Sequence, residues 1–467
     1  MKIRAFLPVV ALLALSCAGA NMTSAPSHNA DLILTGGIVV TMAGPNIEDG
    51  AVVIRNGEIL AVGPTSAIAR DYSAAETVDA RGMAIMPGLV NAHTHAPMVL
   101  FRGIADDRDL MDWLQNFIFP AEAKNVDAEF VRWGTRLAAA EMIRSGTTTF
   151  ADMYYFEADI AREVRAAGLR GVLGETLIDF PAPDNKTWDE AIAYMRQYAE
   201  EFRGDPLITA AVAPHAPFTV SREHLQQVRA LATELNIPIL IHVSETTDEL
   251  KQVAERANGL TPGRYLDQIG FLGPDVVAAH GVWLTSEEIR IFADKGVGIV
   301  HNPESNMMLA SGVAPIAEFR AAGIELGLGT DGPAGSNNNL DMFEEMASAA
   351  RLAKVTSKDP RALGARHVLE MATIGGARAL GLSEKIGTLE PGKRADVILV
   401  DLSAPKTQPL YSVESAIVYA ASGDDVVMTI VEGRVLMRDR RVLTVDIPAT
   451  LMKAREYRER ISASVSQ

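Results

Sequence analysis

Residues 87–95 read Pro87-Gly88-Leu89-Val90-Asn91-Ala92-His93-Thr94-His95 and join the end of the apolar run Ala84–Val90 to two histidines. Because His93 and His95 are two residues apart, their side chains project from the same side of an extended chain. Two imidazoles that face the same way can bind one metal ion. Such a pair can also be an ordinary surface feature, so its meaning depends on the rest of the chain.

Three further residues of metal-ligand type, His242, His280 and Asp331, each end another apolar run. The apolar runs predict strands at Ile85–Val90, Thr148–Asp152, Gly171–Glu175, Leu207–Ala213, Ile239–Val243, Val276–Ala279, Gly298–Val300 and Glu325–Gly329. Helical patterns lie between them at Ala128–Arg144, Ile160–Ala167, Glu223–Leu235, Glu287–Lys295 and Met342–Ala353. Thr285 and Glu288 form a plausible capping box for the fourth helix. This α/β alternation favours a (β/α)₈ TIM barrel over an open doubly wound sheet.

The carboxyl ends of barrel strands meet at one mouth, where active sites are built. The polar residues expected at this mouth are His93 and His95 after strand one, His215 after strand four, His242 after strand five, His280 after strand six, His301 after strand seven and Asp331 after strand eight. The long first crossover, from about Asn91 to Thr148, is expected to cover the site.

Short strand-like segments broken by glycine occur near both ends of the chain and predict one small β-sandwich domain built from both. We therefore divide the chain into a lipoprotein-like signal peptide (1–20), a linker (21–30), the composite β domain (31–86 and 387–447), the catalytic barrel (87–386) and a C-terminal helix and tail (448–467).

The composition is that of an ordinary globular protein, with 467 residues and a formal net charge of −16. This acidic balance argues against nucleic-acid binding, which requires a basic patch. Cys17 is the single cysteine, so no intramolecular disulfide and no cysteine-based zinc site can form. A metal ion must therefore be held by histidine and carboxylate.

The N-terminus has the charged, apolar and small-residue order of a secretory signal: Lys2 and Arg4, then the run Ala5–Leu15, then Ser16-Cys17-Ala18-Gly19-Ala20. Cys17 falls where a bacterial lipoprotein box would place it, and cleavage after Ala20 is the alternative. We expect an exported protein, either periplasmic or membrane-anchored through a lipid on Cys17.

The expected metal ligands are His93, His95, His242 and Asp331, which leave a position for water as a catalytic ion requires. Glu245 lies three residues after His242 and could exchange a proton with that water. His280 could orient the water, whose pKa the ion lowers to about 7. Two plainer interpretations stay open: Asp331, before glycine, as a turn former, and Glu245 as a carboxylate at a helix N-terminus.

From Asp31 to about Leu443 the chain resembles the amidohydrolase superfamily. Within it, the sequence looks like the 5′-methylthioadenosine/S-adenosylhomocysteine deaminases, which are related to the triazine chlorohydrolases. The motifs that carry the resemblance are residues 87–95, Arg102-Gly103-Ile104-Ala105-Asp106-Asp107, Phe119-Pro120-Ala121-Glu122, His242-Val243-Ser244-Glu245-Thr246, His301-Asn302-Pro303-Glu304-Ser305-Asn306, Thr330-Asp331-Gly332 and Gly387-Thr388-Leu389-Glu390-Pro391-Gly392.

The resemblance implies one divalent ion, usually zinc, bound by His93, His95, His242 and Asp331. It also implies that Glu245 is the general acid/base, that His280 polarises the water, and that Asp331 is a catalytic residue as well as a ligand. It also implies that Trp113 packs on the substrate, Glu122 holds the ribose hydroxyls and His215 contacts the purine. A core role for Trp113 in a lid helix remains the alternative. Binuclear relatives carry a lysine at the end of strand four; this chain has Ala213-Pro214-His215 there.

One departure concerns substrate range. Relatives that accept S-adenosylhomocysteine are expected to offer arginine from the strand-three region, and residues 172–195 contain none. We therefore predict deamination of an adenosine-type nucleoside (5′-methylthioadenosine, adenosine, with S-adenosylhomocysteine in doubt). The alternatives are hydrolysis of another exocyclic group on a purine, pterin or triazine ring and, more remotely, a non-catalytic surface-binding lipoprotein. The expected partners are a small-molecule substrate and further copies of the chain in a homo-oligomer.

Overall fold

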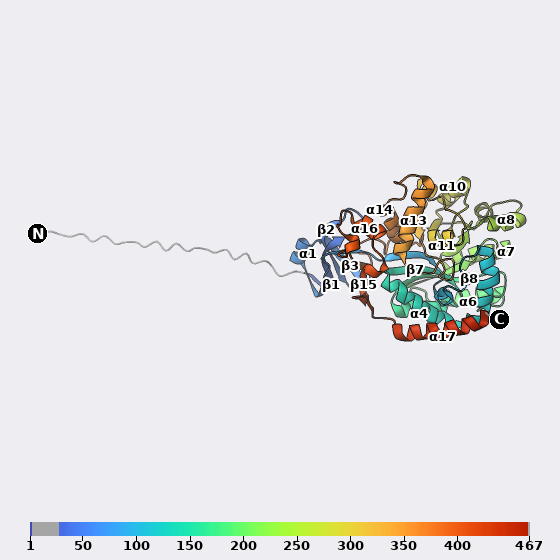
Figure 1. Ribbon diagram of the computed structural model, residues 1–467, viewed down its shortest axis with the longest axis horizontal. Helices are drawn as coiled ribbons and strands as arrows, with labels where there is room; N and C mark the ends of the chain where they lie inside the picture. Colours follow the sequence, from blue (N-terminus) through green and yellow to red (C-terminus); the bar gives the residue numbers. More distant parts are fainter. Residues whose placement is uncertain (2–27, 466–467) are drawn as a thin grey trace.

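Eight parallel strands close into a barrel in the order β10-β11-β12-β13-β6-β7-β8-β9 in the computed structural model, which describes Met1 and residues 28–465 (Figure 1). The strands are β6 (Leu89–Thr94), β7 (Thr147–Tyr154), β8 (Arg170–Leu177), β9 (Ile208–Pro214), β10 (Ile239–Val243), β11 (Val276–His280), β12 (Gly298–His301) and β13 (Leu326–Leu328). The predicted TIM barrel is confirmed.

Helices surround the barrel and bury their apolar faces against the strands. They are α4 (Ala128–Arg144), α5 (Glu157–Ala167), α6 (Trp188–Glu201), α7 (Arg222–Leu235), α8 (Thr247–Arg256), α9 (Pro262–Gln268), α10 (Ser286–Lys295), α11 (Pro303–Met308), α12 (Ile316–Ala321), α13 (Met342–Ser357), α14 (Ala365–Glu370) and α15 (Gly376–Ala379), with a π-helical turn η3 (Met371–Gly375). The capping box of Thr285 and Glu288 is present at the start of α10.

The first barrel strand differs from the prediction, which ran from Ile85 to Val90. The structure divides this run into β5 (Met83–Pro87), which belongs to the small domain, and β6. Gly88 lies between the two strands, where an added Cβ would come within 2.0 Å of the Thr148 side chain. The apolar pattern continues across the division because both strands are buried.

Strands from both chain ends form the predicted composite β domain as one nine-stranded mixed sheet. Its strands are β1 (His28–Val39), β2 (Ile47–Arg55), β3 (Glu58–Pro64), β4 (Tyr72–Asp79) and β5 from the N-terminal part, and β14 (Val397–Asp401), β15 (Val426–Val431), β16 (Arg434–Arg438) and β17 (Arg441–Val442) from the C-terminal part. Antiparallel pairing of β5 with β14 joins the two parts. Helices α1 (Thr65–Asp71) and α16 (Val413–Tyr419) accompany these strands.

Strand β1 begins at His28, within the stretch expected to be linker. Residues 28–35 pair with β4. The segment starts with polar residues, but the apolar residues that follow are buried, which favours a strand over a linker. The expected signal peptide, Cys17 and most of the linker lie outside the described residues.

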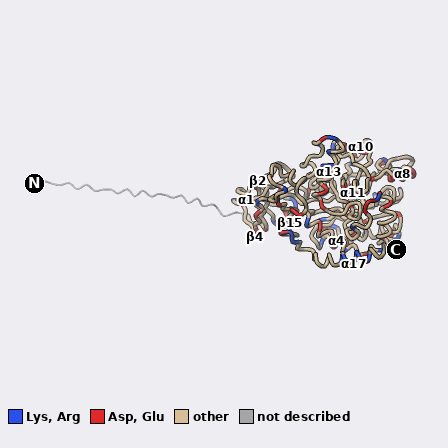
Figure 2. Tube along the Cα trace, viewed as in Figure 1, with Lys and Arg blue, Asp and Glu red and all other residues tan. Residues whose placement is uncertain are grey.

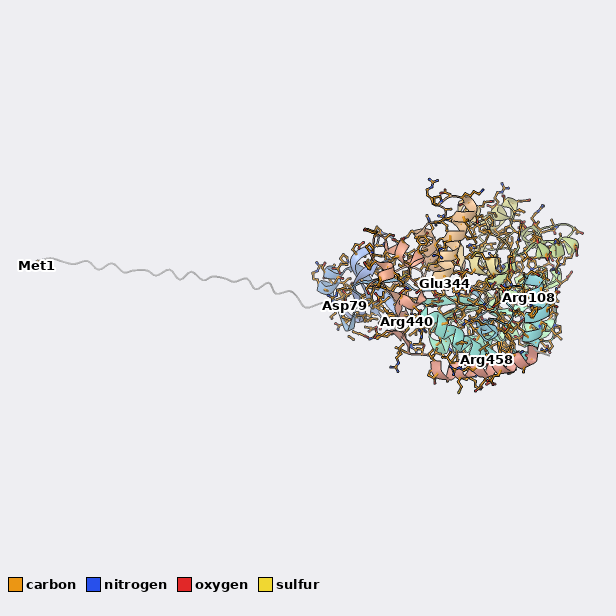
Figure 3. The ribbon with its side chains drawn as sticks, in the orientation of Figure 1. Met1, Asp79, Arg108, Glu344, Arg440 and Arg458 are labelled. Atoms are coloured by element: carbon orange, nitrogen blue, oxygen red, sulfur yellow. The ribbon has the colours of Figure 1, made fainter. Side chains whose placement is uncertain are left out.

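Helix α17 (Ile447–Val465) lies along α4 at the edge of the barrel (Figure 1). Basic and acidic residues are interspersed over both domains (Figure 2). Asp79 lies in the small domain and Arg108 lies on the other side of the fold, in the barrel (Figure 3). Among the helices of the described part, none combines the length and apolar character needed to cross a membrane.

Candidate active site

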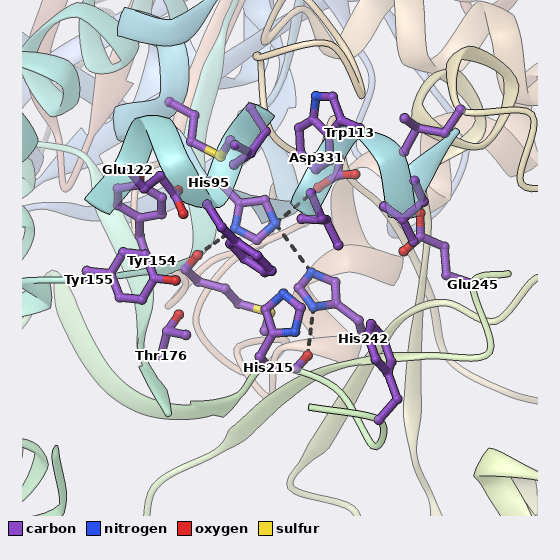
Figure 4. A pocket seen from close by; sticks show the side chains of 18 residues that line it. His95, Trp113, Glu122, Tyr154, Tyr155, Thr176, His215, His242, Glu245 and Asp331 are labelled. Carbon is purple, nitrogen blue, oxygen red and sulfur yellow. Dashed lines mark hydrogen bonds and ion pairs between the residues drawn. The ribbon is translucent and has the colours of Figure 1, made fainter. Parts of the chain in front are cut away.

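Four buried side chains meet at the carboxyl ends of the barrel strands. His93 from β6, His242 from β10, His280 from β11 and Asp331 after β13 each place one potential ligand atom so that all four atoms lie within 4.8 Å of one another. His95 joins them, with its Nε2 3.2 Å from Asp331 Oδ1 and 3.3 Å from His242 Nε2 (Figure 4). The structure thus brings together five of the seven polar residues that the sequence placed at strand ends.

A local irregularity in β6 helps to aim the two histidines. Adjacent residues of a regular strand face opposite sides of the sheet. In β6, however, both Ala92 and His93 face the barrel interior: Ala92 packs in the apolar cluster of inner strand residues, and His93 joins the histidine cluster. The pairing of β6 with β7 shifts register between Asn91 and Thr94, at this point. Such irregularities re-aim side chains next to active sites.

The ring nitrogens of the cluster suit a metal ion. His95 Nδ1 lies 2.5 Å from the Met153 carbonyl oxygen, and His242 Nδ1 lies 2.7 Å from that of His215. A carbonyl only accepts, so each Nδ1 carries the proton and each Nε2 offers its lone pair to the centre. Within the described residues, His93 Nε2 is buried without a hydrogen-bond partner. The donor set therefore fits a bound cation.

The protonation states agree with this fit. Burial lowers the pKa of His93 to about 4 and that of His242 well below its usual value, which keeps both rings neutral. Although burial opposes it, the imidazoles of His93 and His95 beside the carboxylate hold the pKa of Asp331 well below its usual range. Burial also opposes the charged form of His95, but the hydrogen bond and charge of Asp331 raise its pKa to about 9. A cation can replace the proton that His95 and Asp331 share.

Glu245 lies in the short connection between β10 and α8, with its carboxylate directed to the same centre. Its Oε2 is 3.7 Å from His280 Nε2, and burial raises its pKa. Backbone N–H groups of Ser244 and Glu245 donate to the Glu249 carboxylate at 2.8 and 2.7 Å. The N-cap of α8 is Thr246, so Glu245 precedes the helix instead of serving its first turn.

Asp331 follows β13 and forms an isolated parallel β-bridge with Thr94, and its carboxylate belongs to the cluster. Its φ of 63° is the left-handed conformation that Asp adopts more readily than most residues. Its Oδ1 lies 3.2 Å from Nε2 of both His93 and His95. The bridge to Thr94 and the left-handed backbone at Asp331 therefore place its carboxylate beside the two imidazoles.

A cavity opens above these groups and is covered by the first crossover, as expected. This crossover contains η1 (Ala96–Phe101), α2 (Leu110–Asp112), the π-helical turn η2 (Trp113–Ile118) and α3 (Phe119–Asn125). Trp113, Glu122 and His215 all line the cavity together with His95, His242, Glu245 and Asp331 (Figure 4). The first crossover thus supplies part of the cavity wall above the histidine–aspartate cluster.

The sequence of this chain is similar to those of known amidohydrolases. The model of the amidohydrolase family matches residues 84–436. The chain belongs to this family. A 5-methylthioadenosine/S-adenosylhomocysteine deaminase from Syntrophobacter fumaroxidans is 48% identical over 92% of this chain and 98% of that protein.

Two solved structures are similar to this chain. The crystal structure of an adenosine deaminase from Xanthomonas campestris with bound zinc is 42% identical, covers 94% of this chain and 100% of its own, and superimposes with a TM-score of 0.92. An atrazine chlorohydrolase from Arthrobacter aurescens, crystallised with zinc, shares 23% identity over 91% of this chain and 99% of its own, with a TM-score of 0.83. The second likeness shows the shared fold alone.

The side chains of Trp113, Glu122 and His215, which line the cavity, differ in their surroundings. The Trp113 indole donates to the Ala334 carbonyl at 2.8 Å and is buried, so it both lines the cavity and packs in the lid. Burial raises the pKa of the Glu122 carboxyl to about 7. His215 Nδ1 lies 3.0 Å from Thr219 Oγ1, and burial lowers the pKa of His215 to about 3.

His301 does not reach this site, contrary to the prediction. Val300 packs in the same cluster as the inner barrel residues Val277 and Ala92, so the next residue on β12 faces the opposite side. His301 instead lines a separate cavity with residues of α12 and α13. Position at a strand end is not enough, because the side that a residue faces depends on the exact register.

The sequence did not reveal the residues that form hydrogen bonds with the side chains of the site. Ser305, Asn306 and Ser311 contact Asp331, His280 and Glu245, respectively. Ser305 and Asn306 lie in the motif His301–Asn306, which contributed to the family resemblance without a role of its own. That motif was the only indication of them in the sequence.

Proposed function

We propose that this amidohydrolase deaminates adenosine-type nucleosides, such as 5′-methylthioadenosine and adenosine, to the inosine analogue and ammonia. The observation that carries the proposal is the joint placement of Glu245, the histidine–aspartate cluster and Glu122 around one cavity. The names of the similar deaminases support the same reaction class.

The metal in this proposal is one zinc ion held by His93, His95, His242 and Asp331. His280, and not His95, completes the group of four ligand atoms that lie within 4.8 Å of one another, but His280 Nε2 also lies 3.7 Å from Glu245 Oε2. His95 Nε2 contacts His242 and Asp331 instead, which favours His95 as the ligand. When bound, the ion polarises a water molecule and makes it nucleophilic at neutral pH.

The protein groups then divide the proton transfers. Glu245 takes a proton from the attacking water and gives it to the ring nitrogen beside C6, while His280 orients the water. C6 becomes tetrahedral, and Glu245 passes the proton of the new C6 hydroxyl to the exocyclic amine. The bond from C6 to this amine then breaks, ammonia leaves and the C6 carbonyl of the inosine analogue forms. Trp113 and His215 contact the purine, and Glu122 accepts hydrogen bonds from the ribose hydroxyls.

The cavity favours neutral 5′ substituents. Its described lining contains no lysine or arginine. Arg102 pairs with Glu141, and Arg108 pairs with Asp112 and stacks on Phe117. We therefore expect 5′-methylthioadenosine or adenosine to exceed S-adenosylhomocysteine in kcat/KM by about tenfold, which corresponds to one absent charge-assisted contact.

Ammonia release from a panel of nucleosides, free bases and triazines tests the proposal. Turnover of adenosines, with the ranking above, supports it. Equal or better efficiency on S-adenosylhomocysteine would remove the ranking. Turnover of only a free base or triazine would favour hydrolysis of another exocyclic group, and bound metal without any turnover would favour a binding protein.

We also propose export, with a mature protein that begins at Cys17 and carries lipid. Intact-mass analysis of membrane-fraction protein tests this directly. A soluble periplasmic form that begins at Asn21 would support cleavage after Ala20, whereas a cytoplasmic form that keeps Met1 would reject both. Light scattering on the same preparation tests the proposed homo-oligomer.

A further inference from the structure

One short segment behind the site contacts three of its side chains. The segment comprises α11 and the turn that follows it, residues 303–311. Ser305 Oγ donates to Asp331 Oδ2 at 2.7 Å, Asn306 Oδ1 accepts from His280 Nδ1 at 3.1 Å, and Ser311 Oγ donates to Glu245 Oε1 at 3.4 Å. All three contacts are buried.

The backbone of Ser311 is held from two sides. Its N–H donates to the Asn306 carbonyl at 2.9 Å, and its own carbonyl accepts from the Trp283 indole at 2.8 Å. Trp283 lies three residues after His280, so this bond ties the turn to the loop that follows β11. Gly312 is required next, because its φ is 131° and an added Cβ would come within 2.8 Å of Val282.

The two carboxylate oxygens of Glu245 therefore have different partners. Oε1 faces the hydroxyl of Ser311, and Oε2 faces His280 Nε2 at 3.7 Å. The backbone of Glu245 is fixed separately by Glu249. Only the side-chain torsions of Glu245 remain free, and the contact of Oε1 with the Ser311 hydroxyl restricts them.

We propose that Ser311 is a positioning residue, which orients the Glu245 carboxylate for proton transfer, within a segment that also supports His280 and Asp331. This inference rests on the role proposed for Glu245. A misplaced general acid/base loses rate without losing substrate affinity, because binding uses other groups. Loss of the hydroxyl should therefore lower kcat and leave KM and metal content unchanged.

The test is a double-mutant cycle on the metal-loaded enzyme. Ser311→Ala should lower kcat by about tenfold, an effect smaller than that of removing the acid/base itself. Ser311→Thr, which keeps a hydroxyl, should restore most of the rate. In the Glu245→Gln background, Ser311→Ala should have little further effect, because a residue that acts through Glu245 has nothing left to orient.

Ser348→Ala is the matched control. Ser348 Oγ donates to Glu304 Oε1 at 2.8 Å, so this variant removes a serine–glutamate bond from the same segment without a contact to Glu245. Its kcat should stay near wild type.

The proposal is overturned if Ser311→Ala keeps the wild-type kcat, if its effect multiplies with that of Glu245→Gln, or if Ser348→Ala matches it. The cycle is measured on whichever substrate the ammonia panel identifies. Failure on adenosines then overturns the proposed substrate class alone, whereas absence of turnover on every compound overturns both proposals.

Discussion

Two buried polar clusters lie at opposite ends of the barrel strands, and they differ in how their groups are paired. At the amino end of β8, Arg170 contacts Asp396 at 3.0 Å and Glu432 at 2.5 Å, and donates to the Pro206 carbonyl at 2.8 Å. This cluster joins the barrel to the small domain. Each of the guanidinium nitrogens has an acceptor, so the charges there are matched within the protein.

At the carboxyl ends, the pairing is incomplete. Nitrogen lone pairs of His95 and His242 converge on the centre, and His93 Nε2 is buried without a hydrogen-bond partner in the described part of the chain. Buried polar groups are normally satisfied. The contrast teaches that burial alone does not mark a functional site here; convergence of unpaired ligand atoms does.

The largest expected effect comes from removing a group from the histidine–aspartate cluster at the carboxyl ends of the strands. Asp331→Ala should reduce metal content well below one ion per chain and activity to background, because a ligand is missing. Metal analysis and ammonia release measure both. Asp341→Asn is a matched control that should leave the metal in place, since this partly buried carboxylate caps α13 away from the cluster. Normal metal content and rate in Asp331→Ala would refute the ligand assignment.

A substitution in the cluster around Arg170 should instead lower the stability of the protein. Arg170→Ala leaves Asp396 buried without its cation and should lower the free energy of unfolding by about 3–5 kcal/mol. Chemical denaturation measures this, with Arg162→Ala as the control because its pair with Glu201 is half-exposed and should contribute under about 1 kcal/mol. Equal effects of the two variants would contradict the distinction between the clusters.

Glu245→Gln distinguishes the catalytic step from metal binding at the histidine–aspartate cluster. Metal content should stay near one ion per chain, while kcat falls by at least about 10²-fold, the usual contribution of a positioned acid/base. Glu255→Gln on the exposed face of α8 should change neither value. Retained activity in Glu245→Gln would remove this residue from the mechanism.

The smallest effect concerns pH and the ribose contact. Burial raises the pKa of Glu122 to about 7, so the carboxyl is protonated and a poor double acceptor below that pH. The advantage of adenosine over 2′,3′-dideoxyadenosine in kcat/KM should therefore hold above about pH 7 and shrink by up to about tenfold per unit below it. The ratio cancels titrations common to both substrates. A ratio that does not change with pH would argue against the ribose role.

Much of this organisation could be predicted because it depends on local patterns. Helix α4 begins and ends where its apolar periodicity predicts, and Thr285 caps α10 through a bond within one turn. The buried barrel strands appear as apolar runs because both of their faces are covered. His242 and His280 could be placed at the mouth for the same reason, since each ends such a run.

Other features depend on register and on contacts between distant segments. The apolar run near Ile85 does not reveal that it serves two sheets, and the strand-end position of His301 does not reveal which side it faces. The bond of Ser311 to Glu245 joins residues 66 positions apart.

The sequence by itself determined the fold class, the residue types of the metal site and their order along the chain, because these follow from periodicity and side-chain chemistry. Only the tertiary structure decided which of the histidines face one another, how β6 is shifted to aim His93, and which residues hold Glu245 from behind. The physical reason is that a one-residue change in register reverses the side that a strand residue faces, and register is set by packing across the whole barrel.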